Sequence, residues 1–134
     1  MGGSRSRLVF MFSLKQFGKS LSHALRGIQI LFKTEQSFRF QIVIGFVVLI
    51  LATVFPLVSF ERVIILLLVF LVLILEMLNS IFERLVDTFK PRIHPVVGEI
   101  KDIMAAAVLI ASIFAAIIGL LIFVPHFFYQ ATVW

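Results

Sequence analysis

Residues 63–87 read VIILLLVFLVLILEMLNSIFERLVD, and in this stretch an apolar run continues without a break into a helical pattern that carries acids. Residues 63–75 have no polar side chain, and the helical pattern extends through Glu76, Asn79 and Glu83. At about 1.5 Å per residue, a helix of this length crosses a hydrocarbon core about 30 Å thick. The stretch therefore predicts a transmembrane helix with a polar end.

Two further uncharged runs lie on either side of it. QIVIGFVVLILATVFPLV occupies residues 41–58, and IMAAAVLIASIFAAIIGLLIFV occupies residues 103–124. Each is long enough to cross a bilayer with modest shortening or tilt. The sequence therefore predicts an all-α membrane protein with three transmembrane helices.

The composition supports this fold class. Of 134 residues, 61% are hydrophobic and 14% are charged, whereas soluble domains have about 45–50% apolar and about 25% charged residues. This balance excludes a disordered tail, a collagen-like rod and an ordinary water-soluble enzyme. The chain has no cysteine, which excludes disulfides, thiol catalysis and cysteine-ligated metals.

The basic residues predict the orientation of the chain. They are concentrated before residue 41 and again between the second and third spans, at Arg84, Lys90, Arg92 and Lys101. The positive-inside rule places these segments in the cytoplasm and the C-terminus outside. The formal charge of +5 then indicates anionic lipid headgroups, and no nucleic-acid partner is expected.

Residues 13–33 predict an amphipathic helix on the membrane surface. At 100° per residue, the basic and polar side chains fall within about 80° of arc and the apolar side chains cluster opposite them. Such a helix could anchor the bundle or form a lid over a site at the membrane surface. We expect a single domain with a flexible N-terminus (1–12), a surface helix (13–39), a three-span core (40–125) and an external tail (126–134).

The polar residues at the end of the second span form one stripe. Glu76, Asn79, Ser80, Glu83 and Asp87 fall within about 100° of arc on a helix. Charged side chains at membrane depth cost a few kcal/mol on insertion scales, so they usually face a polar interior and serve a function. A snorkelling helix end or an interhelical hydrogen bond is the simpler interpretation for Ser80 and Asp87.

Other charged groups are expected at the same cytoplasmic level. They are Glu35 before the first span, Arg92 and His94 in the second connection, and Lys101 and Asp102 at the start of the third span. Acids from separate helices, together with cations, suit a divalent metal bound to a polyphosphate. The chain contains no G-x-x-x-x-G-K-[ST], HExxH or GxSxG motif. The pattern alone predicts a metal-assisted site at the inner membrane face, and it leaves the reaction open.

The spacing of these residues resembles that of the prokaryotic diacylglycerol kinase and undecaprenol kinase family. The similar pattern is Glu76-x-x-Asn79-Ser80-x-x-Glu83-x-x-x-Asp87, then His94, then Lys101-Asp102-x-x-Ala105. Upstream, Ala24-x-x-Gly27 and Glu35-x-x-Phe38-Arg39 resemble the surface-helix pattern of that family. The resemblance covers about residues 14–124, which is nearly the whole chain.

The resemblance implies a homotrimeric lipid kinase of the bacterial inner membrane whose sites are built between subunits. Such an enzyme moves the γ-phosphoryl group of ATP to a lipid hydroxyl with the help of Mg²⁺. The expected acceptor is diacylglycerol, with undecaprenol as the alternative. From a different class, a small proton- or cation-coupled transporter could use Glu76 as its carrier site. The clustering of polar residues at one end counts against a transporter.

Residue roles follow from the resemblance by position. Glu76 would be the general base, Asn79 would support it, and Glu35 and Glu83 would hold the metal. The expected ATP-binding residues are His23, Glu35, Glu83, Asp87, Arg92, His94, Lys101 and Asp102, and the expected lipid contacts are Phe38, Arg39 and Ala105. Some positions depart from the family pattern: Met104 and Ala105 replace a usual Gly and Ser, and Gln41 stands where some members carry Glu.

Overall fold

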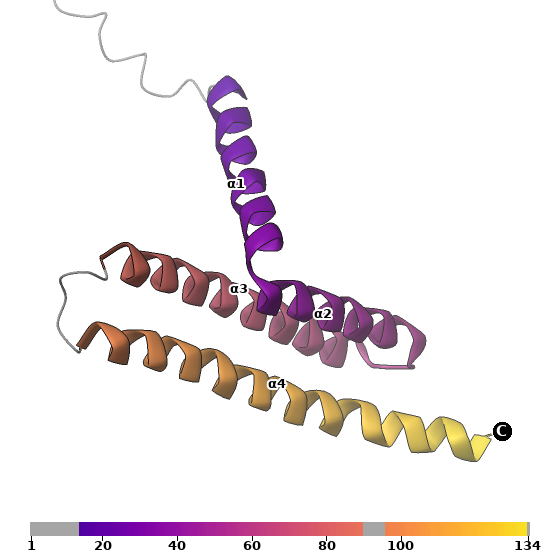
Figure 1. The fold of residues 1–134 in the computed structure, drawn as a ribbon. Helices are drawn as coiled ribbons and strands as arrows, with labels where there is room; N and C mark the ends of the chain where they lie inside the picture. Colours follow the sequence, from indigo (N-terminus) through magenta and orange to yellow (C-terminus); the bar gives the residue numbers. More distant parts are fainter. Residues whose placement is uncertain (1–13, 90–95, 134) are drawn as a thin grey trace, which may run out of the picture. The chain divides into compact units, whose positions relative to one another are not determined.

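The computed structural model describes residues 14–89 and 96–133, apart from the side chains of residues 14, 15, 89 and 130–133. The described residues form helices α1 (Leu14–Thr34), α2 (Gln36–Val54), α3 (Ser59–Phe89) and α4 (Val96–Val133) (Figure 1). Of these, α2, α3 and α4 are long and apolar enough to cross a membrane. The predicted all-α class with three membrane-spanning helices is confirmed. The expected flexible N-terminus and the site residues Arg92 and His94 lie outside the described residues.

Helix α1 belongs to one compact unit, and the residues from Glu35 onward form another. Within α1, Phe17, Leu21 and Leu25 are exposed apolar side chains, and Lys33 lies in the last turn. An exposed apolar face combined with basic residues is typical of a helix that binds a membrane surface.

Helix α1 ends within one residue of the end of the amphipathic helix predicted at residues 13–33. It ends at Thr34, whose hydroxyl donates a hydrogen bond to the Ile30 carbonyl oxygen over 2.9 Å. Glu35 follows with an extended backbone (φ −107°, ψ 113°), and α2 begins at Gln36. The sequence has neither glycine nor proline at this break, so the usual signals of a helix end are missing.

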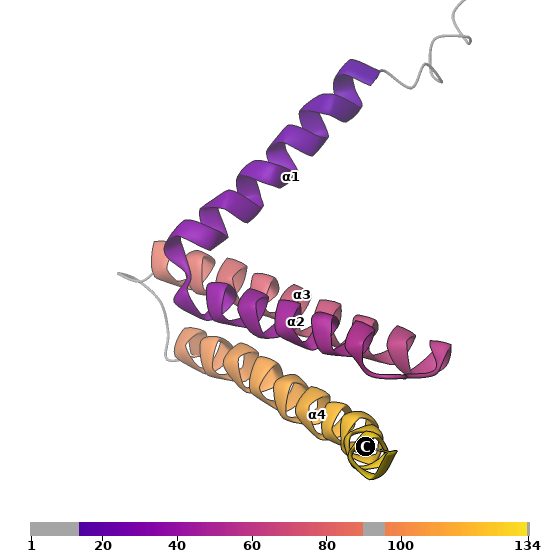
Figure 2. The same cartoon turned by 90° about the vertical axis from the view of Figure 1, so that its right-hand side faces the viewer.

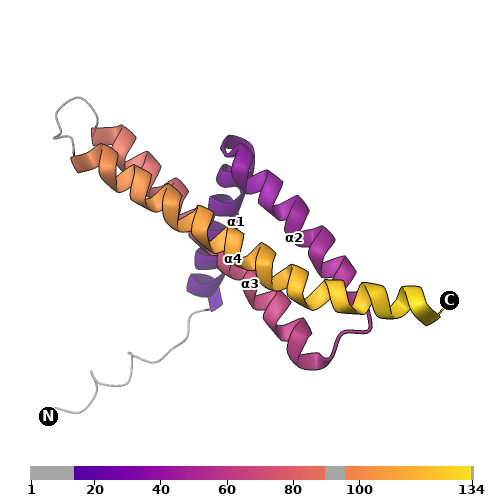
Figure 3. The ribbon, with the colours of Figure 1, turned by 90° about the horizontal axis from the view of Figure 1, so that it is seen from below.

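In the second unit, α3 packs against both α2 and α4. Figure 2 shows the three helices running alongside one another, and Figure 3 shows α4 crossing α3. Helix α2 ends before Pro56, because the preceding residue, Phe55, takes the extended backbone (φ −78°, ψ 146°) that a following proline favours. The end of α3 and the start of α4 lie at the same end of this unit, and α2 begins part-way along α3 (Figure 1).

The opposite end holds the buried apolar cluster of the unit. Ala52, Leu57 and Ile65 form this cluster, with Phe123 of α4 packed against it. Phe123 also meets Phe55 edge to face, with ring centroids 5.6 Å apart. These contacts hold the short α2–α3 connection against α4.

Helix α4 continues through residues that were expected to form an external tail (126–134). It contains Pro125 and runs to Val133. Proline removes one backbone donor and can kink a helix, but it is tolerated in transmembrane helices. His126 also fixes this turn, because its Nδ1 lies 2.8 Å from the Ile122 carbonyl oxygen and its Nε2 lies 3.4 Å from Glu61 Oε2 of α3.

We expect Gly45→Ala to destabilise the bundle by about 1–3 kcal/mol through overpacking. A Cβ atom at Gly45 would lie 2.9 Å from Cγ1 of Val69, whereas a Cβ at Gly119 would meet nothing within 4 Å. Gly119→Ala is therefore the matched control, since both changes gain the same helix propensity. Thermal unfolding in detergent micelles measures the difference. Equal midpoints for the two variants would contradict the close α2–α3 contact.

Candidate functional site

The polar stripe on α3 passes from the interior of the bundle to its surface. Glu76 and Ser80 are 5% and 1% exposed, the side chain of Glu83 is 33% exposed, and that of Asp87 is 49% exposed. The deepest acid therefore lies among the helices and the last acid lies in an open position. The exposure of the acids therefore increases along α3, from a buried carboxylate at Glu76 to an exposed one at Asp87.

Gln41 of α2 contacts the buried carboxylate. Its Nε2 donates a hydrogen bond to Glu76 Oε2 over 3.3 Å. The negative charges of Glu83 and Glu35 also act on Glu76. Buried polar groups need hydrogen bonds to offset their lost hydration, and Gln41 supplies one to Glu76 from a neighbouring helix.

Asn79 lies between Glu76 and Glu83 on the stripe. Its Oδ1 is buried and has no hydrogen-bond partner among the described residues. An unpaired buried acceptor costs about 1–3 kcal/mol. Such an atom often marks the place of a bound water, ion or ligand. Asn79 therefore offers an oxygen to a group that approaches the stripe.

Ion pairs bring the outer carboxylates together with cations. Arg84 Nη2 of α3 lies 2.7 Å from Glu35 Oε1, at the start of α2. Lys101 Nζ of α4 lies 3.8 Å from Glu83 Oε1 and 3.9 Å from Asp87 Oδ1. Residues of α3 thus pair with Glu35, just before α2, and with Lys101 of α4, and we call these ion-paired residues the charge cluster. Such a mixture of acids and cations suits a metal bound together with phosphate groups.

The remaining predicted residues occupy different surroundings. Phe38, in the first turn of α2, is buried, and Arg39 next to it is half-buried. Asp102 and Ala105 are exposed on α4. His23 is exposed on α1, in the other unit. Of the predicted set, the structure shows Lys101 paired with Glu83 and Asp87, while Glu35 and Glu76 contact Arg84 and Gln41, which are outside that set.

Two residues that contact these carboxylates are missing from the predicted set. In the sequence, Gln41 begins the uncharged run at residues 41–58. Arg84 falls among the basic residues that were predicted to connect the second and third spans. Arg84 instead lies inside α3, and both residues pair with acids on another helix. Both residues are polar and stand next to apolar runs. This position predicts that their side chains lie near the charged ends of the membrane-spanning helices.

The donor set fits Mg²⁺ if the metal arrives with phosphate groups. Among residues 14–89 and 96–133, no three His, Asp or Glu side chains are gathered as a metal site. Mg²⁺ usually takes one or two carboxylates and completes its shell with phosphate oxygens and water. The carboxylates of Glu35 and Glu83 and the unpaired Oδ1 of Asn79 are hard oxygen ligands of this kind.

Comparison with known proteins identifies similar sequences over most of the chain. A family described as prokaryotic diacylglycerol kinase matches residues 22–123. Undecaprenol kinase of Bacillus subtilis (strain 168) is 39% identical over 112 residues, which cover 84% of this chain and 91% of that protein. Diacylglycerol kinase of Escherichia coli (strain K12) is 32% identical over 109 residues, which cover 81% of this chain and 89% of that protein.

Proposed function

Because the chain belongs to the prokaryotic diacylglycerol kinase family and is therefore a lipid kinase, we propose that it transfers the γ-phosphoryl group of ATP to the hydroxyl of a membrane lipid. The resemblance stated from the sequence is confirmed at the level of the family. A transporter is not favoured, because the relatives are kinases.

The observation that carries this proposal is the depth of Glu76. A carboxylate that is 5% exposed among apolar helices lies within reach of a hydroxyl that arrives from the membrane. A general base has to lie within hydrogen-bond distance of the proton that it removes. Glu76 would accept the proton of the lipid hydroxyl, and Asn79, one turn away, would orient the reacting groups.

The polyphosphate would bind at the exposed end of the stripe. Lys101 would offset part of its negative charge, and Glu35 and Glu83 would hold Mg²⁺ against it. When bound, Mg²⁺ would neutralise charge on the phosphate oxygens. Phosphoryl transfer depends on such charge neutralisation more than on covalent catalysis. From the family resemblance, we assign further ATP contacts to Asp87, Arg92, His94, Asp102 and His23. Phe38, Arg39 and Ala105 would contact the lipid.

The acceptor has two candidates. The sequence alone favours diacylglycerol, with undecaprenol second. The identity to the undecaprenol kinase, 39%, exceeds that to the E. coli diacylglycerol kinase, 32%, and this difference favours undecaprenol. We therefore rank undecaprenol first and diacylglycerol second.

A side-by-side assay tests both the reaction and the ranking. The purified chain in mixed micelles receives radiolabelled ATP, Mg²⁺ and either undecaprenol or diacylglycerol. We expect labelled lipid with both, and faster labelling of undecaprenol. Undecaprenyl acetate, which lacks the hydroxyl, is the matched control. The absence of label from both alcohols would reject the kinase proposal, and faster labelling of diacylglycerol would reverse the ranking.

We further propose that the N-terminus and the α3–α4 connection lie in the cytoplasm of a bacterial inner membrane and that the C-terminus lies outside. The distribution of arginine and lysine supports this orientation. It would place the charge cluster of Glu35, Glu83, Arg84 and Lys101 on the side where ATP is found. A homotrimer with shared sites follows from the family resemblance.

A further inference from the structure

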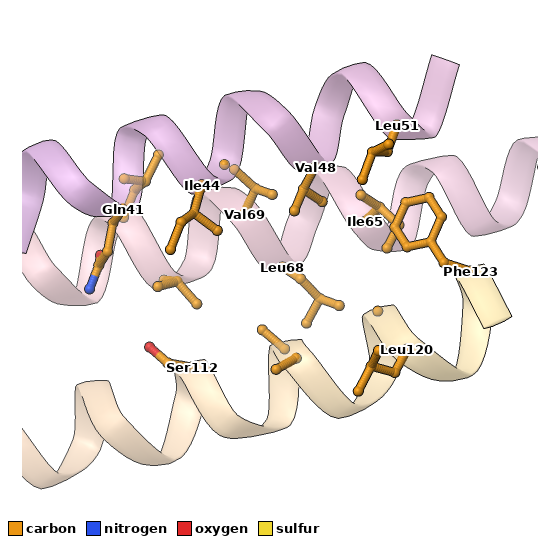
Figure 4. Close-up of a pocket in the computed structure, with 16 residues that line it drawn as sticks. Gln41, Ile44, Val48, Leu51, Ile65, Leu68, Val69, Ser112, Leu120 and Phe123 are labelled. Atoms are coloured by element: carbon orange, nitrogen blue, oxygen red, sulfur yellow. The ribbon is translucent and has the colours of Figure 1, made fainter. Parts of the chain in front are cut away.

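Gln41 stands at the boundary between the buried carboxylate and an apolar cavity. The cavity has a volume of about 480 Å³ and lies between α2, α3 and α4. Figure 4 shows Gln41 and Ser112 at one end, and Leu51, Ile65 and Phe123 at the other. All the other lining residues are apolar or glycine. Gln41 is therefore a polar side chain in a largely apolar environment.

The amide of Gln41 is only half satisfied. Its Nε2 donates to Glu76 Oε2 over 3.3 Å, while its Oε1 is buried with no hydrogen-bond partner among the described residues. A carboxylate oxygen can accept but not donate, so the contact fixes which end of the amide faces Glu76. Rotating the amide would pair its oxygen with another oxygen. The unsatisfied carbonyl is thus a consequence of the contact with Glu76.

This arrangement costs stability. Burying an unpaired carbonyl oxygen is unfavourable, whereas the hydrogen bond from Gln41 offsets part of the lost hydration of the buried Glu76 carboxylate. A residue that is unfavourable for the fold and contacts a candidate catalytic group indicates a trade of stability for activity. The contact with Glu76 is the gain that can offset the cost.

We propose that Gln41 is a positioning residue, whose side-chain amide holds the Glu76 carboxylate toward the polar end of the cavity between α2, α3 and α4. The proposal rests on the proposed function, in which Glu76 accepts the proton of the lipid alcohol. A carboxylate held on one oxygen by Gln41 keeps its other oxygen available for that proton. Small errors in the placement of a base lower the rate strongly, so the effect of Gln41 falls on kcat.

The test compares Gln41→Met with Gln41→His in the full-length protein. Methionine keeps the length of the side chain and removes both polar atoms, whereas histidine keeps an N–H donor. We expect Gln41→Met to lower kcat about tenfold or more with the KM values for ATP and for undecaprenol unchanged. We expect its unfolding temperature to stay close to that of the wild type, because removal of the unpaired carbonyl oxygen offsets the hydrogen bond that Glu76 loses. We expect Gln41→His to recover most of the lost kcat. Ser112→Ala is the matched control at the same end of the cavity.

Three outcomes would overturn the proposal while the wild type is active. They are an unchanged kcat in Gln41→Met, a loss of activity that follows a lower unfolding temperature, and a rise in the KM for undecaprenol at constant kcat. The last outcome would make Gln41 a lipid contact. A wild-type protein that phosphorylates neither lipid alcohol would reject the proposed function and this role together, so the two failures are distinguishable.

Discussion

Replacement of Glu76 by alanine or glutamine is expected to abolish ATP-dependent lipid phosphorylation while the helical bundle stays folded. Loss of a general base lowers rates by about 10²- to 10⁴-fold. Glutamine has nearly the size of glutamate, so Glu76→Gln keeps the packing of this buried position and removes the proton acceptor. A mixed-micelle assay with radiolabelled ATP measures the rate, and the size of the assembly in detergent shows whether it stays intact.

Ser80→Ala is the control for Glu76. Ser80 is on the same stripe of α3 and is 1% exposed. Its replacement therefore tests a change in the same buried environment that removes no acid. We expect Ser80→Ala to keep its activity within a few-fold of the wild type. Near wild-type phosphorylation by Glu76→Gln would remove Glu76 from the role of base.

Replacement of Glu83 or Glu35 by glutamine is expected to raise the Mg²⁺ concentration for half-maximal rate by about tenfold or more, which corresponds to about 1.4 kcal/mol of binding free energy. Each change removes a charged oxygen ligand from the place where the polyphosphate would bind. It also removes the acid that pairs with Lys101 or with Arg84. A titration of the rate with Mg²⁺ at saturating ATP measures the effect.

Glu61→Gln serves as the control for this titration. Glu61 is also a carboxylate of α3, but it lies at the opposite end of the helix and contacts His126. We expect its replacement to leave the Mg²⁺ dependence unchanged. Unchanged titrations in both Glu83→Gln and Glu35→Gln would place the metal elsewhere.

The spanning helices could be predicted from the sequence because a long uncharged run is compatible with few structures other than a transmembrane helix. The polar stripe could also be predicted, since a period of 3.6 residues states which side chains share a face of α3. The structure agrees, with Glu76 and Ser80 buried and Asp87 open to the surface. Periodicity within one helix was sufficient for both results.

Contacts between helices could not be predicted in the same way. The pairs Gln41–Glu76 and Glu35–Arg84 join residues that are 35 and 49 positions apart, and no local pattern specifies which helices meet at which height. Helix α4 continues past Pro125 to Val133, beyond the apolar run at residues 103–124.

The burial of Glu76 also affects which nucleophile reacts. Water competes with every alcohol for an activated phosphoryl group, and a base that is open to solvent would serve both. Glu76 lies at the buried end of the stripe, so in the proposed mechanism bulk water would have poor access to the base and a lipid alcohol would reach it from the hydrocarbon side. The difference in burial along α3 would then protect the nucleotide from futile hydrolysis when no lipid is bound.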